Sequence, residues 1–324
     1  MHLDDGGLWR DDAAPFPPSV IILHAVSSGD LLADRRYEYA RAYLDAGDHA
    51  AAADLFLQAL ERTPGWLPAL VGAADALAAD GRREEAEPLL REAAERDHDG
   101  LFGISLKLAA LGLAEVPDAP PAAYVRGLFD DYADRFETAL VEDLGYRAPW
   151  LIADLIDRVR PGASFARGLD LGCGTGLMAE VLKGRIEHVS GCDLSPEMIG
   201  RAEAGRRYQR LVVADAATFL AAADDGYDLV TAADVLVYVG ALDTLFPAVA
   251  DRLAPDGLFS FTVEEADSDG LVLRDSLRYA HGESYVRRVL AEAGLAVVEL
   301  ERDTLRFDRG EPIRGLIVVA RHEG

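Results

Sequence analysis

Residues 168–176 read Gly-Leu-Asp-Leu-Gly-Cys-Gly-Thr-Gly, and place three glycines in a turn directly after an apolar run. The leucines before the turn predict the end of a buried strand, and apolar residues at helical spacing follow from Leu177. Strand, glycine turn and helix is the order in which a parallel sheet binds a nucleotide-like ligand. Glycine is needed there because the backbone must approach the ligand closely, often at positive φ. The turn therefore predicts an α/β fold with a ligand site at this point.

The spacing of the turn separates three kinds of ligand. A phosphate-binding P-loop ends in Gly-Lys-Ser/Thr, whereas Gly176 is followed by Leu177 and Met178, so that loop is excluded. A dinucleotide fingerprint places its third glycine three residues after the second, whereas Gly176 follows Gly174 by two. This spacing disfavours a nicotinamide-dependent oxidoreductase but leaves it as an alternative.

The four positions Asp170, Gly172, Gly174 and Gly176 form Asp-x-Gly-x-Gly-x-Gly, which resembles motif I of the class I S-adenosylmethionine-dependent methyltransferases. The resemblance implies S-adenosyl-L-methionine as cofactor, with the acid and the glycine backbone around its methionine end. Asp193 ends the next predicted strand and matches the acid that takes the ribose hydroxyls in that family. A carboxylate can accept two hydroxyl hydrogen bonds, whereas a phosphate-bearing ribose favours arginine.

The resemblance extends from about residue 124 to the end of the chain. It implies a doubly wound, seven-stranded mixed sheet that ends in an antiparallel hairpin of residues 295–301 and 313–321. Residues 211–216 match the strand whose terminal acid receives the adenine amino group, and residues 227–234 resemble motif IV. The cofactor-binding residues implied by the family are Tyr124, Tyr132, Asp170, Gly172, Gly174, Gly176, Asp193, Leu194, Met198, Asp215, Ala216 and Asp234.

A segment ahead of the motif, residues 124–144, carries its apolar side chains on one helical stripe. Such a stripe is typical of a core helix. The segment also resembles the Phe-Asp-x-Tyr-Ala-x-x-Phe lid helix of a group of bacterial repeat-containing methyltransferases, in which aromatic side chains close over the cofactor. That resemblance makes Tyr124 and Tyr132 the lid candidates.

The first third of the chain repeats itself with a period of 34 residues. Tyr43, Gly47, Ala52, Phe56 and Ala59 recur as Leu77, Gly81, Ala86, Leu90 and Ala93. The period and the residue types resemble the tetratricopeptide repeat. Two good repeats precede a degenerate third one that begins at Leu101, so the array is expected to lean on the catalytic domain or on a second subunit. It either docks a peptide, protein or carrier, or serves packing or dimerisation.

These patterns divide the chain into an N-terminal all-α part and a C-terminal α/β part. The expected segments are a loose or partly helical N-terminal stretch (1–30), the repeats (31–117), lid and linker helices (118–160) and the methyltransferase domain (161–324).

Composition limits the partners. With 57 acidic against 32 basic residues, the formal charge is −25, and no basic block provides a nucleic-acid face. No apolar run reaches membrane-spanning length, so no membrane partner is expected. Cys173 and Cys192 are the only cysteines, which favours packing roles and a cytoplasmic location. No set of His, Cys and acidic residues has metal-ligand spacing, so no metal is expected.

Methyl transfer from a sulfonium is a direct displacement, so alignment and exclusion of water are the main tasks of such an enzyme. Ligands bind at the carboxyl ends of the strands, which selects Tyr238, Glu264 and the loop containing His281 as catalytic candidates. His281 is the candidate general base, since the pKa of histidine lies near neutrality. In that role, His281→Ala lowers turnover and leaves cofactor affinity intact. Arg278 and Tyr279 are candidates for orienting the substrate.

The segment after the fourth strand lacks Asn/Asp-Pro-Pro-Tyr, with which related enzymes bind planar amino groups. This absence favours an oxygen, carbon or aliphatic amine acceptor, on a small metabolite or on a peptide- or carrier-linked substrate. Besides the oxidoreductase, a non-catalytic scaffold that binds the cofactor is an alternative. A homodimer through the repeats is a further possible assembly.

Overall fold

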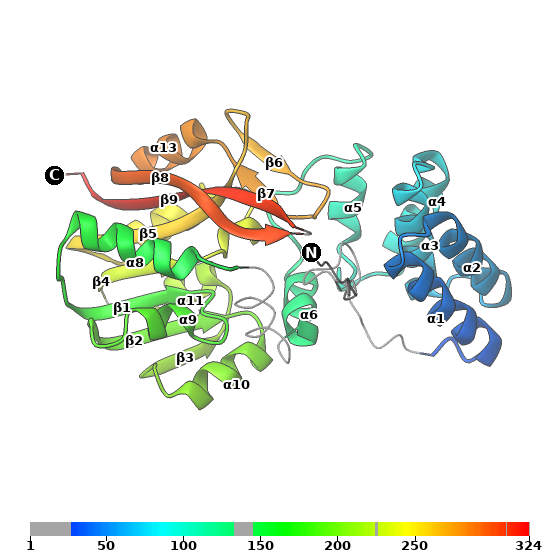
Figure 1. Cartoon of the computed structure of the whole chain (residues 1–324), viewed down its shortest axis with the longest axis horizontal. Helices are drawn as coiled ribbons and strands as arrows, with labels where there is room; N and C mark the ends of the chain where they lie inside the picture. The colour runs from blue at the N-terminus through cyan, green and yellow to red at the C-terminus, as the bar shows by residue number, and fades with distance from the viewer. Residues whose placement is uncertain (1–26, 133–144, 224–225, 309, 324) are drawn as a thin grey trace, which may run out of the picture.

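The computed structural model describes residues 27–132, 145–223, 226–308 and 310–323. The helical array and the sheet domain form the two ends of the molecule, and α5 (Ile104–Ala110) and α6 (Ala122–Tyr132) lie between them (Figure 1). The second half of the predicted lid helix, residues 133–144, lies outside the described residues, as does the side chain of Tyr132.

The array consists of two helical hairpins of the same design. Gly47 and Gly81 connect the helices with φ of 79° and 81°, a conformation that glycine adopts without strain. The same backbone bond closes each turn, from Asp48 N–H to the Tyr43 carbonyl at 2.9 Å and from Arg82 N–H to the Leu77 carbonyl at 2.8 Å. The 34-residue period is therefore present in the hydrogen bonding. The helices are α1 (Leu31–Asp45), α2 (His49–Arg62), α3 (Leu67–Ala79) and α4 (Arg83–Ala94).

Small residues bring these helices close together. The repeated alanines Ala52, Ala59, Ala86 and Ala93 are all fully buried, and Phe56 fills the space beside them. A Cβ on Gly72 would lie 2.7 Å from the Phe56 ring, so α2 and α3 approach more closely than a side chain there would allow.

The third repeat is incomplete, as its sequence predicts. It contributes one short helix, α5 (Ile104–Ala110), before the chain crosses to α6 (Ala122–Tyr132). Ile104 and Leu108 of α5 pack in the core of the array, whereas Leu106 packs against α6 and the sheet domain.

The sheet is mixed and doubly wound. Its parallel strands follow the order β3-β2-β1-β4-β5, β9 pairs antiparallel with β5, and β8 pairs with β9. All seven predicted strands are present, as β1 (Phe165–Leu171), β2 (Ile186–Asp193), β3 (Arg210–Val213), β4 (Tyr227–Ala232), β5 (Leu253–Glu265), β8 (Leu295–Asp308) and β9 (Glu311–His322).

Two details of the sheet differ from the sequence-based expectation. The segment after β5 adds two short strands, β6 (Leu271–Leu273) and β7 (Tyr279–His281), and β7 runs parallel to the end of β5. Residues 253–257 read Leu-Ala-Pro-Asp-Gly, in which proline and glycine predict a turn before the fifth strand. They already belong to β5, because Leu253 pairs with Tyr227 ahead of a register shift. Short pairings of this kind depend on neighbouring strands and carry little local signal.

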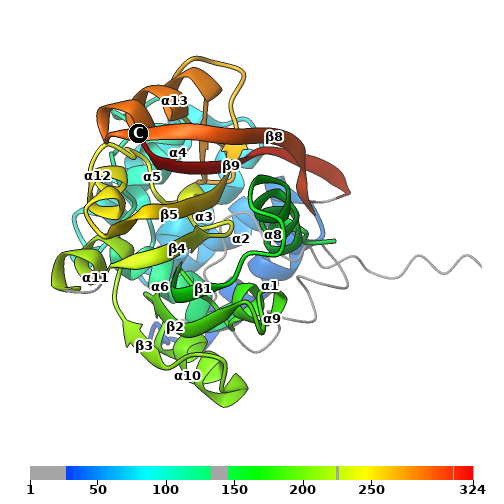
Figure 2. The ribbon, with the colours of Figure 1, turned by 90° about the vertical axis from the view of Figure 1, so that its left-hand side faces the viewer.

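Helices cover both faces of the sheet (Figure 2). One face packs on α8 and α9 through a core that includes Ile156, Met178 and Ile317. The other face packs on α11, α12 and α13 around Phe246, Phe259 and Phe261. The helices of this domain are α8 (Ala148–Val159), α9 (Leu177–Val181), α10 (Pro196–Gly205), α11 (Ala216–Ala222), the 3-10 turn η3 (Leu236–Tyr238), α12 (Leu245–Ala250) and α13 (Glu283–Glu292).

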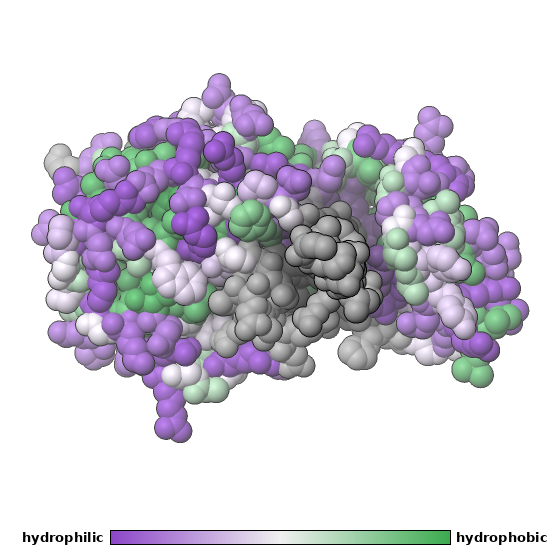
Figure 3. Space-filling view, viewed as in Figure 1, coloured by the Kyte–Doolittle hydropathy of each residue, from purple (hydrophilic) through white to green (hydrophobic). Residues whose placement is uncertain are grey.

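The face of the molecule shown in Figure 3 is mostly hydrophilic, in keeping with the net charge of −25. Within the described ranges, every helix is too short or too polar to cross a bilayer.

A hydrophobic cluster joins the two ends of the molecule. It contains Leu106 of α5, Tyr124 and Val125 of α6, and Leu277 and Tyr279 near β7. The Tyr279 hydroxyl donates to the Pro117 carbonyl at 2.8 Å, which ties the linker before α6 to the sheet. The repeats therefore pack against the sheet domain. So few repeats bury too little surface by themselves and need this contact for stability.

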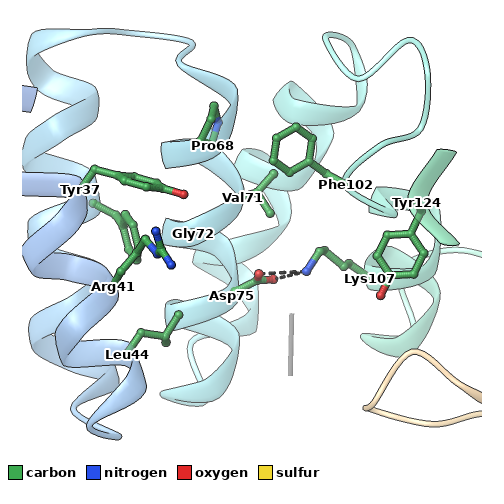
Figure 4. A pocket seen from close by; sticks show the side chains of 11 residues that line it. Tyr37, Arg41, Leu44, Pro68, Val71, Gly72, Asp75, Phe102, Lys107 and Tyr124 are labelled. Carbon is green, nitrogen blue, oxygen red and sulfur yellow. Dashed lines mark hydrogen bonds and ion pairs between the residues drawn. The ribbon is translucent and has the colours of Figure 1, made fainter. Parts of the chain in front are cut away.

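An ion pair is buried in the array beside this cluster. Lys107 of α5 donates to both carboxylate oxygens of Asp75 on α3, at 2.8 and 2.9 Å (Figure 4). Their side chains are only 6% and 14% exposed. Burial raises the pKa of Asp75, and the lysine ammonium opposes that shift.

We predict that Lys107→Met destabilises the protein by about 3 kcal/mol, because removing one partner leaves a buried carboxylate without its counter-charge. Urea unfolding followed by circular dichroism measures the change. Lys183→Met is the matched control, since Lys183 is 74% exposed in its pair with Glu180 and its loss should have little effect. Adding Asp75→Leu to Lys107→Met should recover stability. An unfolding midpoint unchanged by Lys107→Met would contradict the importance of the pair.

Candidate functional site

A cavity of about 440 Å³ opens at the carboxyl ends of the parallel strands. It lies where the strand order reverses between β1 and β4, which is the usual ligand position in an open α/β sheet. Its walls come from the turns after β1, β2, β3 and β4, from the linker before α6 and from α6. Of the residues predicted for the site, Gly172, Gly174, Asp193, Leu194, Asp215, Ala216, Asp234 and Tyr238 line it.

The glycine turn forms the inner wall. Gly172, Gly174 and Gly176 have φ of 61°, 52° and 94°, a region that other residues rarely adopt. A Cβ on Gly172 would lie 2.4 Å from a methyl carbon of Val235. Glycine is thus required both by backbone conformation and by the close approach of the turn after β4.

Asp193 projects from the end of β2 across this turn. Its carboxylate accepts the backbone N–H of Gly174 and of Ser195, each at 2.9 Å. Burial raises the pKa of Asp193, and these hydrogen bonds oppose the shift. Two ionised oxygens offer about four acceptor positions, so a pair of hydroxyl groups can still bind there.

Asp215 follows β3 and caps the next helix. Its Oδ1 accepts the Thr218 N–H at 2.8 Å, the usual N-cap contact at the start of α11. Asp215 and Ala216 therefore present a fixed carboxylate and a small side chain to the cavity wall.

Asp234 is held in an unusual conformation after β4. Its φ is 58°, which is uncommon for a residue with a side chain, and its N–H donates to the Thr262 hydroxyl at 2.9 Å. Arg306 of β8 forms ion pairs with Asp234 and with Glu264 at the end of β5. The arginine side chain is 1% exposed, so these charges neutralise one another away from water.

Tyr238 lines the cavity beside α6. Its ring meets Phe129 edge-on at 5.2 Å between centroids, and its hydroxyl oxygen accepts a hydrogen bond from Arg278 Nε at 3.3 Å. Arg278 itself is buried and lies 3.5 Å from Asp308. Arg278 therefore contacts Tyr238 from the side away from the cavity and does not line the cavity itself.

Helix α6 separates two spaces. Val125 and Phe129 line the large cavity, whereas Tyr124 lines a small cavity of about 30 Å³ together with repeat residues such as Tyr37 and Lys107 (Figure 4). Tyr124 thus joins α6 to the repeats. The structure places it away from the cavity that the lid interpretation assigned to it, because its ring packs on Gly103.

Three further predicted cofactor residues lie behind the lining. Asp170 is 3% exposed and accepts hydrogen bonds from Tyr208 and Thr231. Met198 is fully buried, and Gly176 is the N-cap residue of α9. None of these three residues forms part of the cavity wall.

The catalytic and substrate candidates beyond Tyr238 also lie outside the lining. His281 is fully buried, with Nε2 2.8 Å from the Gly240 carbonyl and its ring stacked near Tyr285. Burial lowers the pKa of His281. Glu264 is held by Arg306, and Tyr279 by Pro117. Pairing in β7 thus turns the His281 side chain into the core, and its role as general base stays a prediction.

Several residues of the site were not indicated by any sequence pattern. Tyr146 lines the cavity and donates to the Ala233 carbonyl at 3.3 Å. The linker residues Asp118 and Pro120 form part of the wall, and Arg306 supports Asp234 from a distant strand. Each reaches the site only through long-range packing, which no local pattern reports.

The charge of the described wall has one sign. Asp118, Asp193, Asp215 and Asp234 contribute carboxylates, and none of the described lining residues is lysine, arginine or histidine. Such a wall suits a ligand that is cationic or rich in hydroxyl and amino donors, and it disfavours a pyrophosphate. Within the described ranges, no group of three His, Cys, Asp or Glu side chains could hold a metal ion.

Comparison with known proteins gives matches to both parts of the chain. Residues 144–300 match the family described as methyltransferase domain, and residues 43–102 match the tetratricopeptide repeat. These matches confirm the two resemblances seen in the motifs.

Curated relatives match only part of this chain. The ubiquinone biosynthesis O-methyltransferase of Burkholderia multivorans is 29% identical over 155 residues, which are 47% of this chain and 62% of that protein. The protein of that name from Burkholderia orbicola is 35% identical over 100 residues, 30% of this chain and 43% of its own. The chain thus spans less than two thirds of these relatives.

Among solved structures, the 1,6-didemethyltoxoflavin-N1-methyltransferase of Burkholderia thailandensis superposes with a TM-score of 0.50 at 22% identity. The match covers 65% of this chain and 94% of that one, whose crystal contains 1,6-didemethyltoxoflavin and S-adenosylhomocysteine. This likeness confirms the class I fold.

We predict that Arg306→Met costs about 3 to 5 kcal/mol of folding stability, because two carboxylates at the back of the site lose their shared counter-charge. Arg302→Met is the control on the same strand. Arg302 pairs with Glu265 and Glu283 but is 49% exposed, so its loss should cost about 1 kcal/mol or less. Equal unfolding midpoints in urea for the two variants would refute the role of Arg306.

Proposed function

We propose that this chain, in which a methyltransferase domain of the class I fold follows tetratricopeptide repeats, binds S-adenosyl-L-methionine and transfers its methyl group. The acceptor is an oxygen, carbon or aliphatic nitrogen atom on a small metabolite or on a peptide- or carrier-linked substrate. The product cofactor is S-adenosyl-L-homocysteine.

The observation that carries this proposal is the position of three carboxylates around the open glycine turn. Asp193 lies at the end of β2, where two ribose hydroxyls can bind its free acceptor positions. Asp215 lies at the end of β3, where an adenine amino group can donate to it. Gly172 and Gly174 leave room for the methionine end between them and Asp234.

The cofactor supplies an electrophilic methyl group when bound. The chain has to align the acceptor with that group and exclude water. Val125, Phe129 and Tyr238 provide an apolar wall for this purpose. Because Arg278 donates to the Tyr238 oxygen, the tyrosine hydroxyl hydrogen is free to point toward an acceptor. We therefore propose Tyr238 as the residue that contacts the substrate.

The remaining predicted residues take supporting roles in this proposal. Glu264 and Arg278 act through Arg306 and Tyr238, and Tyr279 fixes the linker. The repeats serve docking of the acceptor-bearing partner or dimerisation. Proteins named O-methyltransferase among the relatives support an oxygen acceptor as one member of the proposed set.

The alternatives make different binding predictions. An oxidoreductase needs a site for a pyrophosphate, which the acidic described wall disfavours. Calorimetric titration with S-adenosylhomocysteine and with NADH tests this choice, and we expect heat only from the first. Methyl transfer from labelled S-adenosylmethionine to a metabolite or lysate panel separates an enzyme from a scaffold, which would bind the cofactor without turnover.

We predict that Asp193→Ala weakens S-adenosylhomocysteine binding by about 1 to 3 kcal/mol, because it removes a charged acceptor of the ribose hydroxyls. Asp228→Ala is the control. Asp228 also accepts two backbone N–H groups, from Ala166 and Arg167 at 2.9 Å each, but at the opposite ends of the strands. Calorimetry should show wild-type affinity for the control. Unchanged affinity in Asp193→Ala would refute the ribose assignment.

A further inference from the structure

Tyr208 lies against the glycine turn from outside the cavity. It follows α10, and its hydroxyl donates to Asp170 Oδ2 at 2.7 Å. A Cβ on Gly176 would lie 3.0 Å from one edge of its ring, and a Cβ on Gly191 would lie 2.8 Å from the other. The ring therefore occupies the space that these two glycines leave.

The position of Tyr208 is fixed by its neighbour. The Gln209 N–H donates to the Val189 carbonyl at 2.9 Å, and the Gln209 side-chain oxygen accepts the Val189 N–H at 2.6 Å. These two hydrogen bonds to β2 hold the backbone before β3 in place. Tyr208 therefore approaches the turn from a rigid support.

Asp170 is held from two sides. Its Oδ2 accepts from Tyr208, and its Oδ1 accepts from the Thr231 hydroxyl of β4 at 3.1 Å. Asp170 is almost completely buried, and one residue, Leu171, separates it from Gly172. A rotation of Asp170 would consequently displace the turn that lines the cavity.

We propose that Tyr208 is a positioning residue for the cofactor: its hydroxyl orients Asp170 beneath the glycine turn, and its ring supports the turn from behind. This inference rests on the proposed function, because the ligand of the turn is taken to be S-adenosylmethionine. Tyr208 does not line the cavity and acts through Asp170 and the two glycines.

The charge of Asp170 provides a specific readout. Burial raises the pKa of Asp170 to about 7, while the hydrogen bonds from Tyr208 and Thr231 oppose that shift. Asp170 therefore becomes negative as the pH rises through neutrality, and loss of the Tyr208 hydroxyl should raise its pKa further.

Other titratable groups surround this pair. Asp193 raises the pKa of Asp170 by charge repulsion. Cys173 and Tyr146 also lie near Asp170, but burial raises their own pKa values, so they stay neutral in this range. Arg207 lies beside Tyr208 and pairs with Glu180 at 2.5 Å. Removal of the Tyr208 hydroxyl alters none of these side chains. A change in the pH dependence of ligand affinity therefore reports on Asp170.

The test is calorimetric titration of wild type and Tyr208→Phe with S-adenosylmethionine and S-adenosylhomocysteine between about pH 6 and pH 9. The two ligands differ by the positive charge of the sulfonium. In the wild type, the preference for the cation should grow as the pH rises through about 7. In Tyr208→Phe this transition should move to higher pH, and affinity for S-adenosylmethionine near neutrality should fall on the order of tenfold.

Tyr285→Phe is the matched control, because it removes another tyrosine–aspartate bond of 2.7 Å, to Asp243. It should leave the pH of the transition unchanged, and thermal unfolding should show that Tyr208→Phe is folded. The proposal for Tyr208 would be overturned if Tyr208→Phe weakened the binding of both ligands equally at every pH, or did not weaken it at all. A wild type that binds neither ligand would instead refute the proposed function, and Tyr208 would lose its proposed ligand with it.

Discussion

Gly172, Gly174 and Gly176 leave β1 with positive φ, and each wall of the large cavity is arranged around the turn they form. Because a side chain at Gly172 would collide with Val235, the turns after β1 and β4 can close on each other only with glycine there. That close approach brings the carboxylates of neighbouring strand ends toward one space. The ligand site is therefore a consequence of backbone geometry at the point where the strand order reverses.

The site is acidic, and buried arginines lie behind its wall. The chain carries an excess of acid, and carboxylates form the charged part of the described wall. Behind the wall, Arg306 neutralises Asp234 and Glu264, and Arg278 supports Tyr238. Asp234 can thus face a ligand while the cost of burying its charge is offset by Arg306. The terminal hairpin, far from the glycine motif in sequence, becomes part of the same site.

Helix α6 connects the site to the repeats. Val125 and Phe129 face the large cavity, and Tyr124 packs with Leu106 of the incomplete third repeat. A change in the packing of α5 therefore acts on a wall of the cavity through one helix. Two and a half repeats can remain folded because the sheet domain covers the helix face that a further repeat would cover.

Patterns of neighbouring residues were enough to predict the elements that depend on local conformation. Glycines at motif spacing, acids at strand ends and a 34-residue period predicted the class I sheet, the repeats and the set of residues at the cavity that includes Asp193, Asp215 and Asp234. Which side chains face the cavity, in contrast, became clear only from the packing of the whole fold. His281 and Tyr124 belong to the core because strand β7 and helix α6 turn them away, while Tyr146, Tyr208 and Arg306 reach the site through contacts distant in sequence. The physical reason is that spacing along a chain specifies backbone conformation, whereas the direction and charge partner of a side chain depend on what packs against it.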